Sequence, residues 1–77
     1  MKVSEQEIEK HLALYAGVLY ASGSLEITDV RQFINHDISK MAEGFINEHE
    51  PQHLDEQGYL ICMEHYALRE MSDNDND

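Results

Sequence analysis

The chain has 77 residues, one cysteine and a formal net charge of -11 at pH 7, from 16 acidic and 5 basic residues. A single cysteine excludes an internal disulfide framework, and no apolar run approaches the ~20 residues that a membrane-spanning helix needs. The first residues are too acidic and polar for a secretory signal peptide, so we expect a cytoplasmic protein with a single domain over residues 1–71. So short a domain has a small core, and we expect support from a partner, with a second copy of the chain as one candidate.

The first predicted element is a helix over about residues 4–21. Ser4 followed by Glu7 is the capping-box pattern, in which two side chains satisfy free amides at the start of a helix. Apolar residues then recur at intervals of three and four: Ile8, Leu12, Tyr15, Val18 and Leu19. Serine and glycine at residues 22–24 supply turn geometry, so the helix is predicted to end there.

A second helix is predicted to begin at Thr28 or Asp29, either of which can cap it, and to end near residues 48–50, just before Pro51. This segment has the clearest amphipathic stripe in the sequence: Val30, Phe33, Ile34, Ile38, Met41, Phe45 and Ile46. The core residues predicted from this stripe are Phe33, Ile34, Met41 and Phe45.

A third helix is predicted to begin at Pro51, because proline suits the first turn of a helix. Gly58 leaves two options open, which are one continuous helix or a short turn followed by a main helix from Tyr59. Residues 72–77 contain only Ser, Asp and Asn, so nothing offsets the entropy of ordering them. The sequence therefore predicts an all-α fold, a small three- to four-helix domain with a disordered acidic C-terminal tail.

The acidic residues concentrate in the second half of the chain. From Ala42 onward ten acids accompany one base, Arg69, for a net charge of -9, whereas residues 1–41 total -2. Such a field repels nucleic acid and attracts basic surfaces. We therefore predict a protein-binding module that contacts neither nucleic acid nor membrane directly. It would act as a phage or mobile-element inhibitor does, by docking on the basic, nucleic-acid-binding surface of another protein in place of nucleic acid.

The predicted partner-binding residues are of two kinds. Four acids bracket Pro51, where one helix ends and another begins, and two tyrosines fall outside the strongest apolar stripes, a location that suits a ring at an interface. The six residues are Glu48, Glu50, Asp55, Glu56, Tyr20 and Tyr59.

The sequence leaves two alternative roles open. The charge can serve solubility alone. The chain can also be a structural accessory subunit of a larger complex, bound through exposed apolar and tyrosine surface. Pro51-Gln52-His53-Leu54, with His65, resembles a short stretch of the theta accessory subunit of bacterial DNA polymerase III, a small three-helix protein. The resemblance covers that stretch alone, and the chain is not assigned to the family.

Histidines and the cysteine gather between residues 49 and 65. Cysteine and histidine are the usual ligands of zinc, and the candidate ligands are His49, His53, Cys62 and His65. Structural zinc sites usually present paired ligands on tight knuckles, whereas Cys62 stands alone in an apolar segment, where a small buried side chain is its ordinary role. We predict no metal and no cofactor, and we keep a small zinc-binding domain as the minor alternative.

The sequence also predicts that the protein is not an enzyme. Cys62 with a histidine would need an oxyanion site and an electropositive setting that lowers the thiol pKa. The surrounding carboxylates have the opposite effect on that pKa. Adjacent acids such as Asp55 and Glu56 point in different directions on a helix and do not form a catalytic pair.

Overall fold

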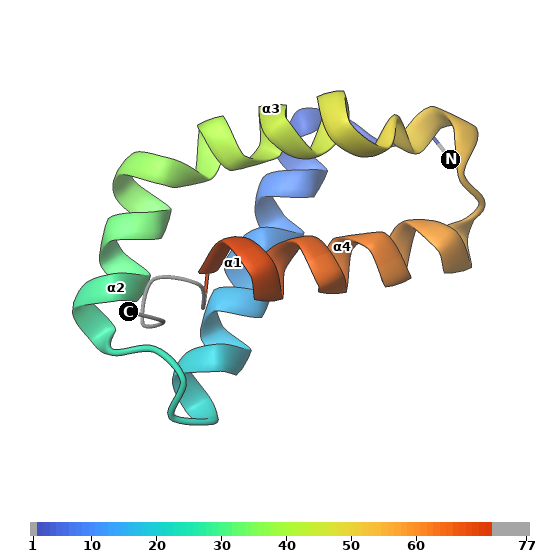
Figure 1. Cartoon of the computed structure of the whole chain (residues 1–77). Helices are drawn as coiled ribbons and strands as arrows, with labels where there is room; N and C mark the ends of the chain where they lie inside the picture. The colour runs from blue at the N-terminus through green and yellow to red at the C-terminus, as the bar shows by residue number, and fades with distance from the viewer. Residues whose placement is uncertain (1, 72–77) are drawn as a thin grey trace.

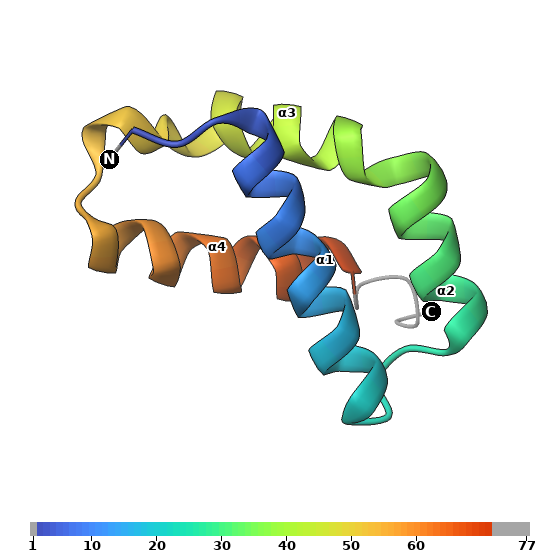
Figure 2. The same cartoon turned by 180° about the vertical axis from the view of Figure 1, so that it is seen from behind.

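The structure, a computed structural model, describes residues 2–71 and has an all-α fold. Along the chain it comprises α1 (Glu5–Ala21), α2 (Ile27–Gln32), a π-helical segment (Phe33–Asp37), α3 (Ile38–His49), a 3-10 turn (Pro51–His53) and α4 (Glu56–Met71). α3 and α4 lie side by side in opposite directions, and α1 crosses them, behind in Figure 1 and in front in Figure 2. The predicted fold class is confirmed for this part of the chain, whereas the tail at residues 72–77 lies outside the described residues.

The start of α1 follows its sequence signal. The Glu7 N–H donates to Ser4 Oγ at 3.2 Å, and the Ser4 N–H donates to Glu7 Oε1 at 3.0 Å, which is the reciprocal pair of a capping box. At the other end Gly23 has a φ of 87°, a conformation that glycine adopts without steric cost. The Ser24 N–H then donates to the carbonyl of Leu19 at 2.8 Å and closes the helix.

α2 begins at Ile27, ahead of Thr28 and Asp29, the two capping residues that the sequence suggested. Glu26 has extended backbone and immediately precedes the helix, and its N–H donates to Asp29 Oδ2 at 3.1 Å. The prediction that Thr28 or Asp29 caps this helix is therefore wrong. Asp29 lies inside the first turn and satisfies the amide of the capping residue from there.

The predicted second helix is divided by the π-helical segment, where the chain bends from α2 into α3 (Figure 1). A π turn holds about one residue more than an α turn, so the residues beyond it are rotated by about 100° relative to a continuous α-helix. Phe33, Met41 and Phe45 consequently share the buried side, whereas Ile34 is 45% exposed. The prediction of Ile34 as a core residue is wrong, because its neighbour Phe33 takes the inward position.

The predicted third helix is also divided, although not at Gly58. Pro51–His53 form the 3-10 turn, and Leu54 is extended, with φ of -108° and ψ of 152°. Asp55 then caps α4, because its Oδ1 accepts a hydrogen bond from the Gly58 N–H at 2.7 Å and its carbonyl accepts one from the Tyr59 N–H. Gly58 thus lies in the first turn of α4, and the main helix begins at Glu56 and not at Tyr59.

The core lies where α1 crosses the α3–α4 pair. Three residues of α1, namely Ile8, Leu12 and Ala16, are fully buried there, and Phe45 of α3 with Tyr59 and Met63 of α4 meet them. Aromatic rings form its centre, with Phe45 in edge-on contact with Tyr59 at 5.8 Å and with Tyr66 at 5.4 Å between centroids. The centre of the core is therefore held by directional ring contacts as well as by apolar burial.

α3 and α4 approach each other closely at Gly44. The Tyr66 hydroxyl donates to the carbonyl of Met41 at 2.8 Å, and a Cβ atom added at Gly44 would lie 2.7 Å from that hydroxyl. Glycine is thus required at this position by the space that Tyr66 occupies. The contact holds the C-terminal half of α4 against the middle of α3.

Candidate functional site

The turn between α3 and α4 carries three exposed carboxylates, Glu50, Asp55 and Glu56, which we call the acidic corner. Glu50 ends α3 in the left-handed conformation, with φ of 46°, and its N–H donates to the carbonyl of Ile46 at 3.0 Å. Asp55 caps α4, and Glu56 is its first residue, so both carboxylates lie at the positive end of the helix dipole.

The backbone of the acidic corner is held on both sides. The His53 N–H donates to the carbonyl of Glu50 at 2.9 Å, the Leu54 N–H donates to the carbonyl of Pro51 at 3.0 Å, and the Pro51 ring is buried. Within residues 2–71 the acidic corner makes no ion pair with lysine or arginine, and His53 Nε2 lies 3.5 Å from Glu50 Oε1. The turn therefore holds the backbone of the acidic corner in place, and its carboxylates face solvent.

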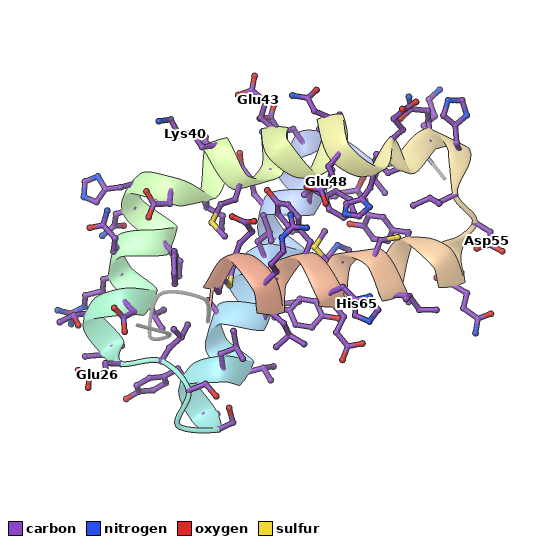
Figure 3. All side chains as sticks on the ribbon, viewed as in Figure 1. Glu26, Lys40, Glu43, Glu48, Asp55 and His65 are labelled. Carbon is purple, nitrogen blue, oxygen red and sulfur yellow. The ribbon has the colours of Figure 1, made fainter. Side chains whose placement is uncertain are left out.

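Glu48, the fourth predicted acid, forms an ion pair with Arg69 of the same chain. Its two carboxylate oxygens accept hydrogen bonds from Arg69 at 2.7 and 2.8 Å, and the same guanidinium lies 5.3 Å from the centre of the Tyr66 ring. The hydrogen bonds from Arg69 hold the pKa of the Glu48 carboxyl below its ordinary value. Figure 3 shows Glu48 directed from α3 toward α4. Glu48 therefore ties α3 to α4 and is not part of the acidic corner.

The two predicted surface tyrosines differ. Tyr20 is 48% exposed near the end of α1, but Tyr59 is 0% exposed, so the prediction that Tyr59 lies at the surface is wrong. Its hydroxyl hydrogen-bonds to His11 Nδ1 at 2.7 Å, and burial raises its pKa from 10.0 to about 12. Tyr59, Met63 and Tyr66 recur at intervals of four and three, a helical spacing that would have indicated the burial of Tyr59.

The structure does not bring the four candidate zinc ligands together. His49 packs between the rings of Phe45 and Tyr66, and its Nε2 lies 3.2 Å from Glu48 Oε2 without hydrogen-bond geometry. Cys62 is half-buried against the core, while His53 and His65 are exposed. In Figure 3 His65 lies on the side of α4 away from α3. Over the described range, no three His, Cys, Asp or Glu side chains form a group that could hold a metal ion.

Several large apolar side chains are exposed, although the sequence did not indicate which residues would form such a surface. Leu14 and Val18 on α1 are 65% and 59% exposed. On α4 the exposed apolar residues are Leu60, Ile61 and Leu68. The available signal was the pair Leu60-Ile61, because these two residues lie outside the spacing of four and three that links Tyr59, Met63 and Tyr66.

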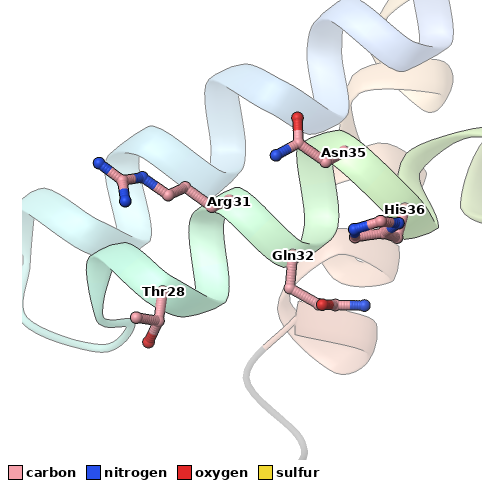
Figure 4. A pocket seen from close by; sticks show the side chains of 5 residues that line it. All are labelled: Thr28, Arg31, Gln32, Asn35 and His36. Carbon is pink, nitrogen blue, oxygen red and sulfur yellow. The ribbon is translucent and has the colours of Figure 1, made fainter.

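A surface depression of about 190 Å³ lies on the outer side of α2 and the π-helical segment. Figure 4 shows its lining side chains, Thr28, Arg31, Gln32, Asn35 and His36. Each of them can donate a hydrogen bond, and none is acidic. The side chains spread along one face of a single helical stretch, however, so they do not converge on a common point (Figure 4).

No helix in the described part of the chain is long and apolar enough to cross a membrane. The chain matches no protein-family model, and comparisons with curated proteins and with solved structures find no significant match. Its function must therefore be argued from its own surfaces.

Proposed function

We propose that the protein is a protein-binding module whose acidic corner docks on a basic, nucleic-acid-binding surface of another protein. It would act as an inhibitor of the kind that phages and mobile elements produce, by occupying the place of nucleic acid. The proposal rests on one observation, which is that Glu50, Asp55 and Glu56 stand exposed on a fixed turn without a lysine or arginine partner among the described residues.

Electrostatics support this role. Arg69, the only base in the acidic half of the chain, is already bound by Glu48 and Glu70, so it does not neutralise the acidic corner. Carboxylates carried on an ordered turn can meet the lysine and arginine rows that otherwise bind phosphates, and the backbone of the turn needs no further ordering on docking. This field would also raise the association rate with a basic partner.

The test removes the charge of the corner without disturbing its backbone. The triple variant Glu50→Gln, Asp55→Asn and Glu56→Gln keeps the cap of α4, because asparagine caps helices as well as aspartate does. The matched control removes three charges elsewhere, through Glu5→Gln, Glu9→Gln and Glu43→Gln. With a partner recovered by affinity capture and then purified, we expect the corner variant to bind at least about tenfold more weakly, and the control to retain its affinity.

Two further measurements decide the mode of binding. Affinity should fall steeply with added salt, and duplex DNA or RNA should compete with the protein for its partner. Unchanged affinity in the corner variant at low salt would refute the proposal.

The second candidate function is that of a structural accessory subunit, bound through apolar surface. The exposure of Leu14, Val18 and Ile61 favours it, and Tyr20 remains available for it, whereas Tyr59 does not. Binding of this kind should change little with salt and should survive removal of the corner charges.

A further inference from the structure

We propose that an amphipathic helix of the partner, with an apolar stripe bordered by lysine and arginine, binds along the contact between α1 and α4. The residues that would receive it are Leu14 and Val18 of α1 and Leu60, Ile61 and Leu68 of α4, which we call the α1–α4 seam. This inference rests on the proposed function for the basic character of the partner. It adds the secondary structure and the apolar anchors that the partner must present.

The apolar side chains of the seam fall at helical spacing on each helix. Leu14 and Val18 are one turn apart on α1, and Ile61 and Leu68 are two turns apart on α4, so each pair forms a short stripe. The five residues of the seam are 41% to 65% exposed, and none of them belongs to the hydrophobic core of the described chain. Single exposed apolar residues are ordinary on a protein surface, but stripes on two helices in contact indicate a binding surface.

Side-chain contacts show that the two stripes flank one helix crossing. His11 Nδ1 lies 2.7 Å from the Tyr59 hydroxyl, with the two rings 5.4 Å apart in an edge-on arrangement. One turn further along, Tyr15 lies close enough to Glu64 for the carboxylate, together with burial, to raise the tyrosine pKa. Leu14 and Val18 lie within a turn of Tyr15, and the three α4 residues lie within a turn of Glu64.

The charges beside the seam are mostly acidic. Burial raises the pKa values of Tyr59 and Tyr15, and the carboxylates of Glu7 and Glu64, respectively, add to the rise. Neither glutamate forms an ion pair with a lysine or arginine that the structure describes. Glu56 precedes the seam on α4, and Lys10, one turn from Leu14, is the base nearest to it along α1. A partner with basic residues beside its apolar anchors therefore complements the seam.

The same charges disfavour a second copy of the chain. In a two-fold dimer the seam would meet itself, so that Glu7 and Glu64 of each copy would approach the acids of the other. Each copy also carries a net charge of -11, which opposes self-association.

The partner segment is inferred to be a helix because the described part of the chain has no strand with which an extended peptide could pair. The regular structure of residues 2–71 is entirely helical, so this part of the chain offers no strand edge to which an extended peptide could hydrogen-bond. A helix satisfies its own backbone and needs only apolar contacts and charges from the seam. Side-chain ridges of two crossing helices are also the ordinary packing surface for a third.

The experiment uses the full chain and synthetic peptides as probes. One peptide of about 18 residues carries leucine at helical spacing and lysine elsewhere, a second has the same composition in scrambled order, and a third has glutamate in place of lysine. The seam variant is Leu14→Gln, Val18→Gln and Ile61→Gln. Its matched control, Ile27→Gln and Ile34→Gln, changes two residues of α2 and the π-helical segment that are each 45% exposed. Binding is measured by calorimetry in about 150 mM salt.

We expect the leucine–lysine helix to bind one peptide per chain, and the scrambled and glutamate peptides to bind at least about tenfold more weakly. The seam variant should lose at least about tenfold in affinity for the helical peptide, and the control variant should lose none. Equal binding of the helical and scrambled peptides, or wild-type affinity in the seam variant, would overturn the inference.

Peptide binding by the seam variant and by the corner variant distinguishes failure of the seam inference from failure of the proposed function. If only the corner variant loses the peptide, the peptide is held by the corner, and the seam inference is wrong while the proposed function stands. If only the seam variant loses it, the seam inference holds, and the proposed function is decided by its own partner assay. A dimer in sedimentation velocity that the seam variant dissociates would assign the seam to a second copy and overturn the inference.

Discussion

α3 and α4 pack against the same core, but they differ on their outer sides. The outer side of α3 is polar, with Lys40, Glu43 and Asn47 exposed, and its apolar residues face inward. α4 buries Tyr59, Met63 and Tyr66 on one side and exposes Leu60, Ile61 and Leu68 on the other. A helix that is apolar on most sides is ordinarily buried on most sides. The core therefore accounts for the apolar residues of α3, whereas α4 has apolar residues both in the core and on its exposed side.

The largest expected effect is on the inner side of α3. Phe45 is fully buried and contacts the rings of Tyr59, Tyr66 and His49, so Phe45→Ala should lower the free energy of unfolding by about 3 to 5 kcal/mol. A domain of this size has roughly that much stability in total, so the variant should be largely unfolded. Far-ultraviolet circular dichroism during urea titration measures the change. A cooperative transition at the wild-type midpoint would contradict the core described here.

Two glycine substitutions sharpen the comparison between packed and open helix surfaces. Gly44→Ala should destabilise the protein by about 1 to 3 kcal/mol, because the new Cβ meets the Tyr66 hydroxyl and displaces it from the Met41 carbonyl. Gly17→Ala should stabilise it by about 0.5 to 1 kcal/mol, because nothing lies within 4 Å of the new atom. Thermal and urea unfolding measure both, and the same sign for the two changes would argue against the close approach of α4 to α3.

Alkaline titration tests the inner side of α4. Burial raises the pKa of Tyr59 from 10.0 to about 12, so the folded protein retains this phenol proton more tightly than the unfolded chain does. The associated stability is fully present below pH 10.0 and is lost as the pH rises toward about 12. Tyrosinate absorbance should show a late ionisation step that coincides with unfolding and is smaller in Tyr59→Phe, where Tyr66, whose pKa burial also raises, still contributes. Complete ionisation of the native protein in one step near 10.0 would show that Tyr59 is accessible.

The smallest expected effect is on the outer side of α4. Ile61 is 48% exposed, so Ile61→Gln should change the free energy of unfolding by no more than about 0.5 kcal/mol in the isolated protein. The difference between this change in the free energy of unfolding and that of Phe45→Ala shows how much less the exposed side of α4 contributes to stability than the core does. If Ile61→Gln is as damaging as a core substitution, the outer side of α4 already contributes to the fold, and its difference from the outer side of α3 disappears.

The sequence predicts helix ends well where the signal is local. The capping box of Ser4 and Glu7, and the end of α3 ahead of Pro51, depend on neighbouring residues alone, and both are confirmed. The π-helical segment is not predictable from neighbouring residues, because the apolar stripe from Val30 to Ile46 fits a continuous helix. Packing against α1 decides which of Phe33 and Ile34 faces inward. The third helix is predicted to begin at Pro51, but α4 begins at Glu56, so Asp55 is its cap and Glu56 is its first residue.

The candidate surfaces were harder to predict, because they depend on how the helices are arranged. Glu48 and Arg69 are 21 residues apart, and their pairing requires α3 and α4 to lie side by side. Tyr59 was assigned to the surface because it falls outside the strongest apolar stripes, although the spacing to Met63 and Tyr66 was present. The exposed stripes of α1 and α4 become one surface only when the helices cross.

The π-helical segment also sets the size of the molecule. The helical stretch from Ile27 to His49 contains 23 residues, and as one straight α-helix it would be about 35 Å long. The longest dimension of the described protein is 33 Å, so an unbent helix would span the whole length of the molecule and leave part of its apolar side without cover. Deleting one residue at Asn35 would restore the regular helical repeat. The product would be an elongated chain, recognisable by a larger hydrodynamic radius and by a loss of cooperative unfolding.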